Sequence, residues 1–212
     1  MKGYDYSVLK ERKIYNIVLP LGKLVYGAKY KVKFTGLENI PAEGGFILAS
    51  NHMCAIDPIM LAVGCGKRQL HFMGKKELFE NPFVKKILTL VNGFPVARGS
   101  ADTKALKYAA RVVNEGYILG MFPEGTRSKD HKPARAKSGI SLIAYEAKAN
   151  VLPVAIYNDE DMKNGTKVTI RFGEMIPYES LGLTDGSKEE FKATSKFIMD
   201  EIVKLWEMGH CE

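Results

Sequence analysis

The sequence predicts an α/β fold in which a mostly parallel, twisted sheet carries helices on its faces. Short apolar runs of strand length alternate with longer segments whose apolar residues recur at helical spacing. Residues 117–122 form a nearly continuous apolar run, which is typical of a parallel strand covered on both sides. No Pro/Gly/Ser-rich linker divides the chain. We therefore expect an α/β domain over residues 30–212, preceded by a helical segment at residues 1–29.

The elements follow from apolar spacing and turn residues. Strands are expected at residues 30–34, 46–49, 69–73, 94–97, 117–122, 151–157 and 167–172. Helices are expected at residues 14–28, 58–63, 82–91, 137–148 and 188–208, with a further helix that Ser100 or Asp102 caps and Gly116 closes. Asn164-Gly165 predicts an antiparallel hairpin between the last two strands. The last helix is expected to turn inward Phe191, Thr194, Phe197, Ile198, Ile202 and Leu205.

The basic charge is concentrated at the start of the chain. The net charge is +7, and residues 1–40 hold eight Lys or Arg against three acidic residues. Such an excess suits an anionic lipid surface, a phosphorylated ligand or nucleic acid. We find no recognisable nucleic-acid module, zinc spacing or repeat, so neither nucleic acid nor a metal is expected as a partner. Three cysteines without paired spacing predict reduced thiols and a cytosolic setting.

Residues 14–28 predict a basic-flanked amphipathic helix. Its apolar residues recur at helical spacing: Ile14, Ile17, Val18, Leu21, Leu24 and Val25. A membrane-spanning helix needs about 20 apolar residues, and this run is shorter and contains Asn16 and Lys23. Two interpretations stay open. The helix lies on a membrane surface, or it is an ordinary amphipathic helix that packs on the core.

A titratable pair follows the expected strand at residues 46–49. His52 can accept a proton from a hydroxyl, and Asp57, a short loop away, can orient the imidazole and stabilise the imidazolium. An alternative is structural: Asp57 followed by Pro58 also fits a helix N-cap and first helical position. Cys54, between them, is either a nucleophile or a small packed residue. His71, on the next expected strand, is interpreted as packed rather than as a second base.

A second strand-then-polar-turn unit occurs at residues 122–128, Phe-Pro-Glu-Gly-Thr-Arg-Ser. Together with Asn51-His52-x4-Asp57, the run Gly-Phe-Pro-Val-Ala-Arg at residues 93–98 and Val-Leu-Pro-Val at residues 151–154, it resembles four sequence blocks, in order, of one family. This is the glycerolipid acyltransferase family, which includes the 1-acylglycerol-3-phosphate acyltransferases of the PlsC type. The resemblance covers roughly half of the chain.

The resemblance assigns roles to the matched residues. It implies that His52 and Asp57 are catalytic. The substrate-binding residues would be Asn51, Arg98, Glu124, Gly125, Thr126, Arg127 and Lys137. Arg98 and Arg127 suit phosphate, because a planar guanidinium can bind it through two parallel hydrogen bonds. Glu124 would hold a glycerol hydroxyl or orient Arg127. Since the carboxyl ends of strands form the binding edge of α/β sheets, these groups are expected in one cleft.

The implied reaction moves a fatty acyl group from a thioester to the free sn-2 hydroxyl of lysophosphatidic acid, giving phosphatidic acid. The donor is acyl-CoA or acyl carrier protein, a co-substrate, and no cofactor is expected. Because no Gly-x-Ser-x-Gly elbow is present, direct transfer with His52 as base is the simpler scheme. Alternatives are another acceptor, such as glycerol 3-phosphate or another lysophospholipid, hydrolysis of the thioester, or a catalytically silent membrane-surface protein. An anionic membrane surface is the expected partner, at the cytoplasmic face, with peripheral or monotopic attachment.

Overall fold

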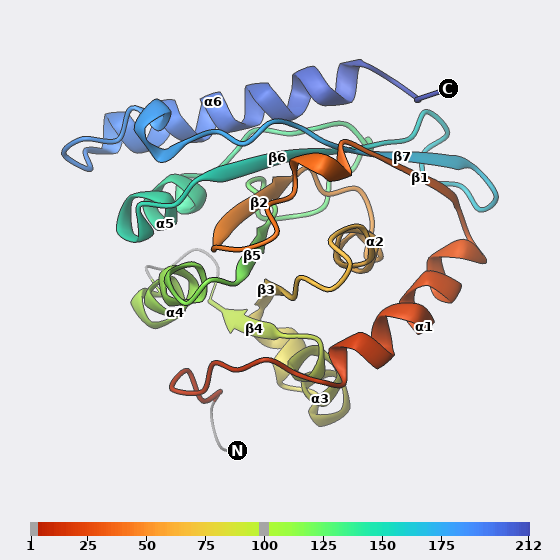
Figure 1. Ribbon diagram of the computed structural model, residues 1–212, viewed down its shortest axis with the longest axis horizontal. Helices are drawn as coiled ribbons and strands as arrows, with labels where there is room; N and C mark the ends of the chain where they lie inside the picture. Colours follow the sequence, from red (N-terminus) through yellow and green to blue (C-terminus); the bar gives the residue numbers. More distant parts are fainter. Residues whose placement is uncertain (1–3, 98–101) are drawn as a thin grey trace.

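The described residues of the computed structural model, 4–97 and 102–212, form a seven-stranded sheet with helices on both faces (Figure 1). The strands are β1 (Lys31–Thr35), β2 (Phe46–Ser50), β3 (Leu70–Lys75), β4 (Gly93–Val96), β5 (Ile118–Met121), β6 (Val151–Tyr157) and β7 (Lys167–Phe172). The helices are α1 (Tyr15–Gly27), α2 (Asp57–Gly64), α3 (Pro82–Leu90), α4 (Thr103–Asn114), α5 (Gly139–Ala147) and α6 (Lys188–Glu207). Short 3₁₀ helices are η1 (Leu37–Asn39), η2 (Lys76–Phe79) and η3 (Tyr178–Leu181).

The strand order, within the described residues, is β1-β7-β6-β2-β5-β3-β4. Strands β6, β2, β5, β3 and β4 are parallel to one another. The expected antiparallel pairing of β6 with β7 is confirmed, and β1 runs parallel to β7. The predicted mostly parallel α/β fold is therefore confirmed. Because five parallel strands end at one edge of the sheet, the carboxyl ends of β2, β4 and β5 lie on the same side of the molecule.

The central strand β2 shows why the apolar runs are continuous. All five of its residues are buried. Ile47 and Ala49 belong to the core cluster that α4, α5 and α6 cover, whereas Phe46 and Leu48 belong to the cluster beneath α1 and α2. A strand covered on both faces has no position for a polar side chain, so it carries none until Ser50, at its end.

Helix α1 turns its apolar side away from the protein. Its buried residues are Tyr15, Gly22 and Tyr26, whereas Ile17, Leu21 and Leu24 are 67%, 57% and 70% exposed. The interpretation that the apolar face packs on the core is therefore wrong. The inner face is instead fixed by the Tyr15 hydroxyl, which accepts a hydrogen bond from the Leu70 amide at 3.1 Å, and by Gly22. A Cβ at Gly22 would lie 2.7 Å from the Ile59 side chain, so only glycine allows this approach.

The segment before α1 is fastened to the sheet and to α4. The Tyr6 hydroxyl donates to the Pro95 carbonyl at 2.9 Å, and the Tyr108 hydroxyl donates to the Val8 carbonyl. Gln69 exchanges two hydrogen bonds with the backbone of Arg12. The division of the chain at residue 29 stays a prediction, and residues on both sides of it pack on the same sheet. Within the described residues, no helix is both long and apolar enough to cross a bilayer.

The predicted C-terminal helix is confirmed as α6, but not every residue expected on its inner face is buried. Ile198 and Ile202 are buried as expected, whereas Phe197 is exposed. Thr194 lies inside as expected, and Ser195, which was not expected there, is buried beside it. The Thr194 hydroxyl donates to the Leu181 carbonyl at 2.7 Å, and Ser195 donates to Ser141 of α5 at 2.9 Å. These bonds bring α6 close to α5 and rotate Phe197 outward.

Candidate active site

The loop after β2 holds His52 against Asp57. The Nδ1 atom of His52 lies 2.7 Å from Oδ2 of Asp57, and the His52 side chain is 14% exposed while that of Asp57 is fully buried. A carboxylate accepts hydrogen bonds only, so it holds the proton on Nδ1. The Nε2 atom is then the unprotonated nitrogen and can accept a proton from a substrate. This is the geometry of a general base with an orienting acid.

Asp57 is not a helix N-cap. It is the first residue of α2, the N-cap is Ile56, and the cap makes no side-chain hydrogen bond to the helix. The carboxylate accepts instead from the backbone amides of Met53 at 2.6 Å and Cys54 at 2.8 Å. The N-cap interpretation is therefore wrong, because the side chain turns back into its own loop. There it fixes the backbone that leads from His52 to α2.

The Cys54 thiol contacts the other oxygen of the same carboxylate. Its Sγ donates to Oδ1 of Asp57 at 3.0 Å. Burial raises the pKa of the Cys54 thiol to about 12, and the Asp57 carboxylate acts in the same direction. A thiol with this pKa stays protonated near neutral pH and is a hydrogen-bond donor rather than a nucleophile. The interpretation of Cys54 as a small packed residue is the one that the geometry supports.

Asn51 has a structural position that the sequence analysis did not anticipate. Its side chain is buried, its Nδ2 donates to the Ile156 carbonyl at 2.9 Å, and its Oδ1 accepts from the Ile156 amide at 2.8 Å. Both ends of the amide are therefore paired with the backbone of β6. This corrects its placement among the substrate-binding residues, because the side chain joins the His52 loop to the neighbouring strand and does not face the cleft.

The turn after β5 lies directly beside His52. The imidazole stacks on the Phe122 ring, with centroids 4.0 Å apart. The Ser128 amide donates to the His52 carbonyl at 2.8 Å. Since β2 and β5 are adjacent parallel strands, both contacts follow from the sheet order. The predicted convergence of residues 51–57 and 122–128 on one site is thus observed.

Within this second turn the residues differ in exposure. Glu124 is buried, with Oε1 accepting from the Ala134 amide at 3.2 Å and no partner for Oε2 among the described residues. Burial raises the pKa of Glu124 to about 7. Gly125 adopts φ +69°, and a Cβ there would lie 3.1 Å from Nζ of Lys137. Thr126 and Arg127 are exposed. The turn therefore presents a hydroxyl and a guanidinium beside the imidazole.

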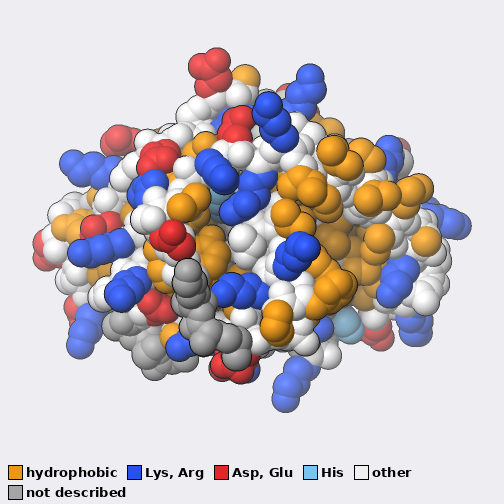
Figure 2. Space-filling view, turned by 90° about the horizontal axis from the view of Figure 1, so that it is seen from below, with side chains coloured by type: hydrophobic (Ala, Val, Ile, Leu, Met, Phe, Trp, Pro, Cys, Tyr) orange, Lys and Arg blue, Asp and Glu red, His pale blue; other side chains and the backbone are white. Residues whose placement is uncertain are grey.

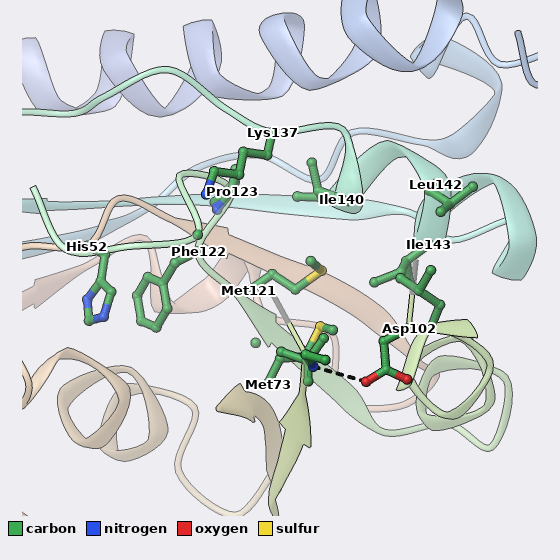
Figure 3. A pocket seen from close by; sticks show the side chains of 16 residues that line it. His52, Met73, Asp102, Met121, Phe122, Pro123, Lys137, Ile140, Leu142 and Ile143 are labelled. Atoms are coloured by element: carbon green, nitrogen blue, oxygen red, sulfur yellow. Dashed lines mark hydrogen bonds between the residues drawn. The ribbon is translucent and has the colours of Figure 1, made fainter. Parts of the chain in front are cut away.

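An apolar cavity of about 320 Å³ runs inward from His52. In Figure 3, His52 and Phe122 lie together at one end, Asp102 and Leu142 lie at the other, and Met73 and Met121 lie between them. Besides His52, Asp102, Phe122 and Pro123, the lining residues are mostly apolar and come from β3, β4 and the residue after it, β5, α4 and α5: Met73, Val96, Ala97, Leu106, Gly120, Met121, Gly139, Ile140, Leu142 and Ile143. Lys137 and Gly125 also line it. Such a cavity suits a hydrocarbon chain.

Two further expectations concern β3 and the residues that follow β4. Arg98 lies outside the described residues. The chain on both sides of it is held by Asp102, which accepts from the Ala97 amide at 3.0 Å and from the Ala105 amide at 3.1 Å as the N-cap of α4. His71 is buried among apolar groups, and burial lowers its pKa to about 4. It is therefore a packed, neutral residue, as expected.

The comparison with known families decides the class of this site. The model of the Acyltransferase family matches residues 31–157, more than half of the chain. The chain belongs to the acyltransferase family. The match runs from β1 to the end of β6 and so contains the turns after β2 and β5.

Individual acyltransferases are similar over most of the chain. The protein named 1-acyl-sn-glycerol-3-phosphate acyltransferase of Bacillus subtilis (strain 168) is 37% identical over 187 residues, which cover 86% of this chain and 92% of that protein. The protein of the same name from Borreliella burgdorferi is 32% identical, covering 85% of this chain and 73% of the relative. The crystal structure of the 1-acyl-sn-glycerophosphate (LPA) acyltransferase PlsC from Thermotoga maritima superposes with a TM-score of 0.72 at 25% identity, covering 94% and 83% of the two chains. The predicted family resemblance and the enzyme class are confirmed.

The cavity residues and the Phe122 ring that stacks on His52 were not identified from the sequence. Phe122 stands within the third block, and its position at the end of β5 was the signal that could have placed it beside the imidazole. The cavity residues gave no separate signal. Met121, Ile140 and Ile143 have the apolar character and spacing of any core residue.

Proposed function

We propose that this acyltransferase moves a fatty acyl group from an acyl thioester to the sn-2 hydroxyl of lysophosphatidic acid by direct transfer. One observation carries the proposal: the 2.7 Å contact of His52 Nδ1 with the buried Asp57 carboxylate, at the mouth of an apolar cavity. The contact engages Nδ1 and leaves Nε2 available to accept the hydroxyl proton. The names of the similar proteins support the same acceptor.

The reaction follows from the arrangement of groups. Nε2 of His52 takes the proton of the acceptor hydroxyl, whose oxygen attacks the thioester carbonyl carbon. The carbon–sulfur bond then breaks, and the imidazolium returns its proton to the leaving thiolate. Asp57 stabilises the positive imidazolium between these two steps. General-base assistance of this kind contributes a factor of about 10²–10⁴.

The charged groups of the second turn suit the acceptor's phosphate. Arg127 is exposed one residue before Ser128, whose amide contacts the His52 backbone. Lys137 reaches the same turn at Gly125. We assign phosphate binding to Arg127, with Lys137 beside it, and we keep Arg98 as a second guanidinium on the basis of its matched block. Thr126 and Gly125 complete this turn, and Glu124 orders it from behind through the Ala134 amide.

The cavity behind His52 is assigned to the acyl chain of the donor, which is acyl-CoA or acyl carrier protein. The apolar outer face of α1 is assigned to the lipid surface from which the acceptor comes, and its flanking lysines suit anionic headgroups. We therefore propose peripheral attachment at the cytoplasmic face of a membrane.

An acyl-donor assay across several acceptors tests the function. The purified protein would be incubated with radiolabelled acyl thioester and, in separate reactions, lysophosphatidic acid, glycerol 3-phosphate, another lysophospholipid or no acceptor. We expect phosphatidic acid with lysophosphatidic acid, and a loss of about 10²–10⁴-fold in rate for His52→Ala. Thioester consumption that is equally fast without acceptor would show hydrolysis instead. A faster reaction with glycerol 3-phosphate would reassign the acceptor.

A further inference from the structure

Helix α3 and the 3₁₀ helix before it leave large apolar side chains uncovered. Phe83 is 73% exposed, Leu78 is 49% exposed and Ile87 is 46% exposed. Helix α3 has no buried residue at all, although it is an amphipathic helix of a folded domain. We call Leu78, Phe83 and Ile87 the η2–α3 surface. A surface of this kind in a monomeric protein marks an interaction site.

The exposed apolar residues are concentrated rather than scattered. Twelve large hydrophobic residues are exposed within the described part of the chain. Eight of them lie on α1 with its N-cap or on the η2–α3 surface: Ile14, Ile17, Leu21, Leu24, Val25, Leu78, Phe83 and Ile87. Helices α1 and α3 both lie on the lower side of the molecule in Figure 1. Figure 2 looks at that side and shows hydrophobic side chains gathered there, with Lys and Arg around them.

Basic residues border the η2–α3 surface. Lys76 in η2 lies two residues from Leu78, and Lys86 in α3 is next to Ile87; both are exposed, as are Glu77 and Glu80 of the same segment. Apolar side chains surrounded by lysines are complementary to an anionic bilayer, because the apolar groups enter the headgroup boundary while the ammonium groups stay among the phosphates.

We propose that the η2–α3 surface is a second membrane contact, which enters an anionic lipid surface beside α1. The inference rests on the proposed function, which places α1 at the membrane. A single helix lying on a bilayer leaves the protein free to roll about the helix axis. Two contacts that are not collinear remove this freedom. Since β4 follows α3 after only Val91 and Asn92, and Val96 lines the cavity, the second contact sets the height of the cleft relative to the headgroups.

Vesicle co-sedimentation tests the proposal without using activity. Wild type, Phe83→Ser/Ile87→Ser and Leu21→Ser/Leu24→Ser would be mixed with vesicles of phosphatidylglycerol and phosphatidylcholine. Phe197→Ser/Met208→Ser is a matched control, since both residues are exposed apolar side chains at α6. We expect each of the first two double variants to weaken binding about tenfold or more, and the control to bind as wild type. All replaced side chains are exposed, so thermal melts should stay close to those of wild type.

The outcomes separate this inference from the proposed function. Normal binding of Phe83→Ser/Ile87→Ser, with weakened binding of Leu21→Ser/Leu24→Ser, would overturn the second contact alone. Normal binding of both would overturn the membrane role of α1 as well. Turnover of a short-chain acceptor dissolved as monomers should be unchanged in Phe83→Ser/Ile87→Ser. Lys76→Glu/Lys86→Glu should weaken binding to phosphatidylglycerol vesicles but not to vesicles of phosphatidylcholine alone.

Sedimentation velocity tests whether a second copy of the chain covers the surface. A wild-type dimer that Phe83→Ser/Ile87→Ser converts to monomer would show that a second copy, not lipid, covers it.

Discussion

The turns after β2 and β5 lie side by side but are organised differently. In the first turn the side chains of Asn51, His52 and Asp57 all have partners within the chain. In the second, Arg127 is exposed, and one oxygen of Glu124 has no partner in the described part of the chain. The named side chains of the first turn are therefore held by the chain itself, whereas the guanidinium of the second turn is open to solvent.

This difference matches two tasks of an acyltransferase. A base must already be oriented when the hydroxyl arrives, because reorganisation during the reaction would cost rate. A phosphate-binding group must be open to solvent so that a large lipid headgroup can enter. Substitutions in the first turn should therefore lower kcat, whereas substitutions in the second should raise KM for the acceptor or change the pH response.

Asp57→Asn is expected to have the largest effect, a fall in kcat of about 10²–10⁴-fold. The amide can keep its oxygen toward the Met53 and Cys54 amides, so the loop stays formed, but the negative charge that stabilises the imidazolium is lost. Steady-state kinetics with a saturating acceptor measures the fall. Asp57→Ala is the comparison variant and should also be destabilised, because it leaves two amides without their acceptor. Full activity in Asp57→Asn would remove the carboxylate from the mechanism.

Glu124→Gln should change how stability depends on pH. Burial raises the pKa of Glu124 from 4.5 to about 7. Between these values the unfolded chain releases a proton that the folded chain retains, so the free energy of unfolding falls as pH rises from about 4.5 to about 7. This shift is worth on the order of 3 kcal/mol. The amide is neutral throughout and should remove the decline.

Urea unfolding at several pH values measures this effect. Glu189→Gln, at an exposed position of α6, serves as the control and should keep the decline of wild type. The same pH dependence in wild type and Glu124→Gln would show that Glu124 does not retain its proton in the folded state.

Arg127→Ala should raise KM for a phosphate-bearing acceptor about 10- to 100-fold, with kcat little changed. Charge-assisted hydrogen bonds to phosphate contribute roughly 1.5–3 kcal/mol. Acceptor titrations at a fixed donor concentration measure the change. Arg135→Ala is a matched control, since Arg135 is also exposed in the loop after the turn. An equal rise in KM for a monoacylglycerol, which has no phosphate, would show that Arg127 does not bind the phosphate.

The features of the fold that depend on where strands end were predicted correctly from the sequence. The apolar runs before His52 and before Glu124 located β2 and β5, and the parallel arrangement placed both turns at one edge. The antiparallel pairing of β6 with β7 was likewise predicted, although the connection runs over residues 158–166 and Asn164-Gly165, with φ +87° at the glycine, forms only its last part. These features are local in sequence, so neighbouring residues carry the information.

Orientation and pairing across the fold were harder to predict. The apolar stripe of α1 has the period of a packed helix, and only the Tyr15 and Gly22 contacts reveal that this stripe faces outward. Asn51 stands in the same block as His52, yet its partner, Ile156, is more than a hundred residues away. Whether a polar side chain meets substrate or a distant backbone depends on the packing of the sheet, which apolar periodicity does not encode.

Cys54→Ala is expected to have the smallest effect, a fall in kcat of about 2- to 10-fold, the worth of one modest hydrogen bond. The thiol donates to Oδ1 of Asp57, the oxygen that His52 does not use, so its loss leaves the carboxylate held on one side only. Kinetics of Cys54→Ala and Cys54→Ser would be compared, with Cys211→Ala as control. The serine hydroxyl is also a donor and should restore most of the rate, with KM unchanged. If both substitutions abolished turnover while the fold stayed intact, the thiol would be a nucleophile and the direct-transfer scheme would be wrong. If Cys54→Ala matched wild type, the first turn would hold its carboxylate through the two amides alone.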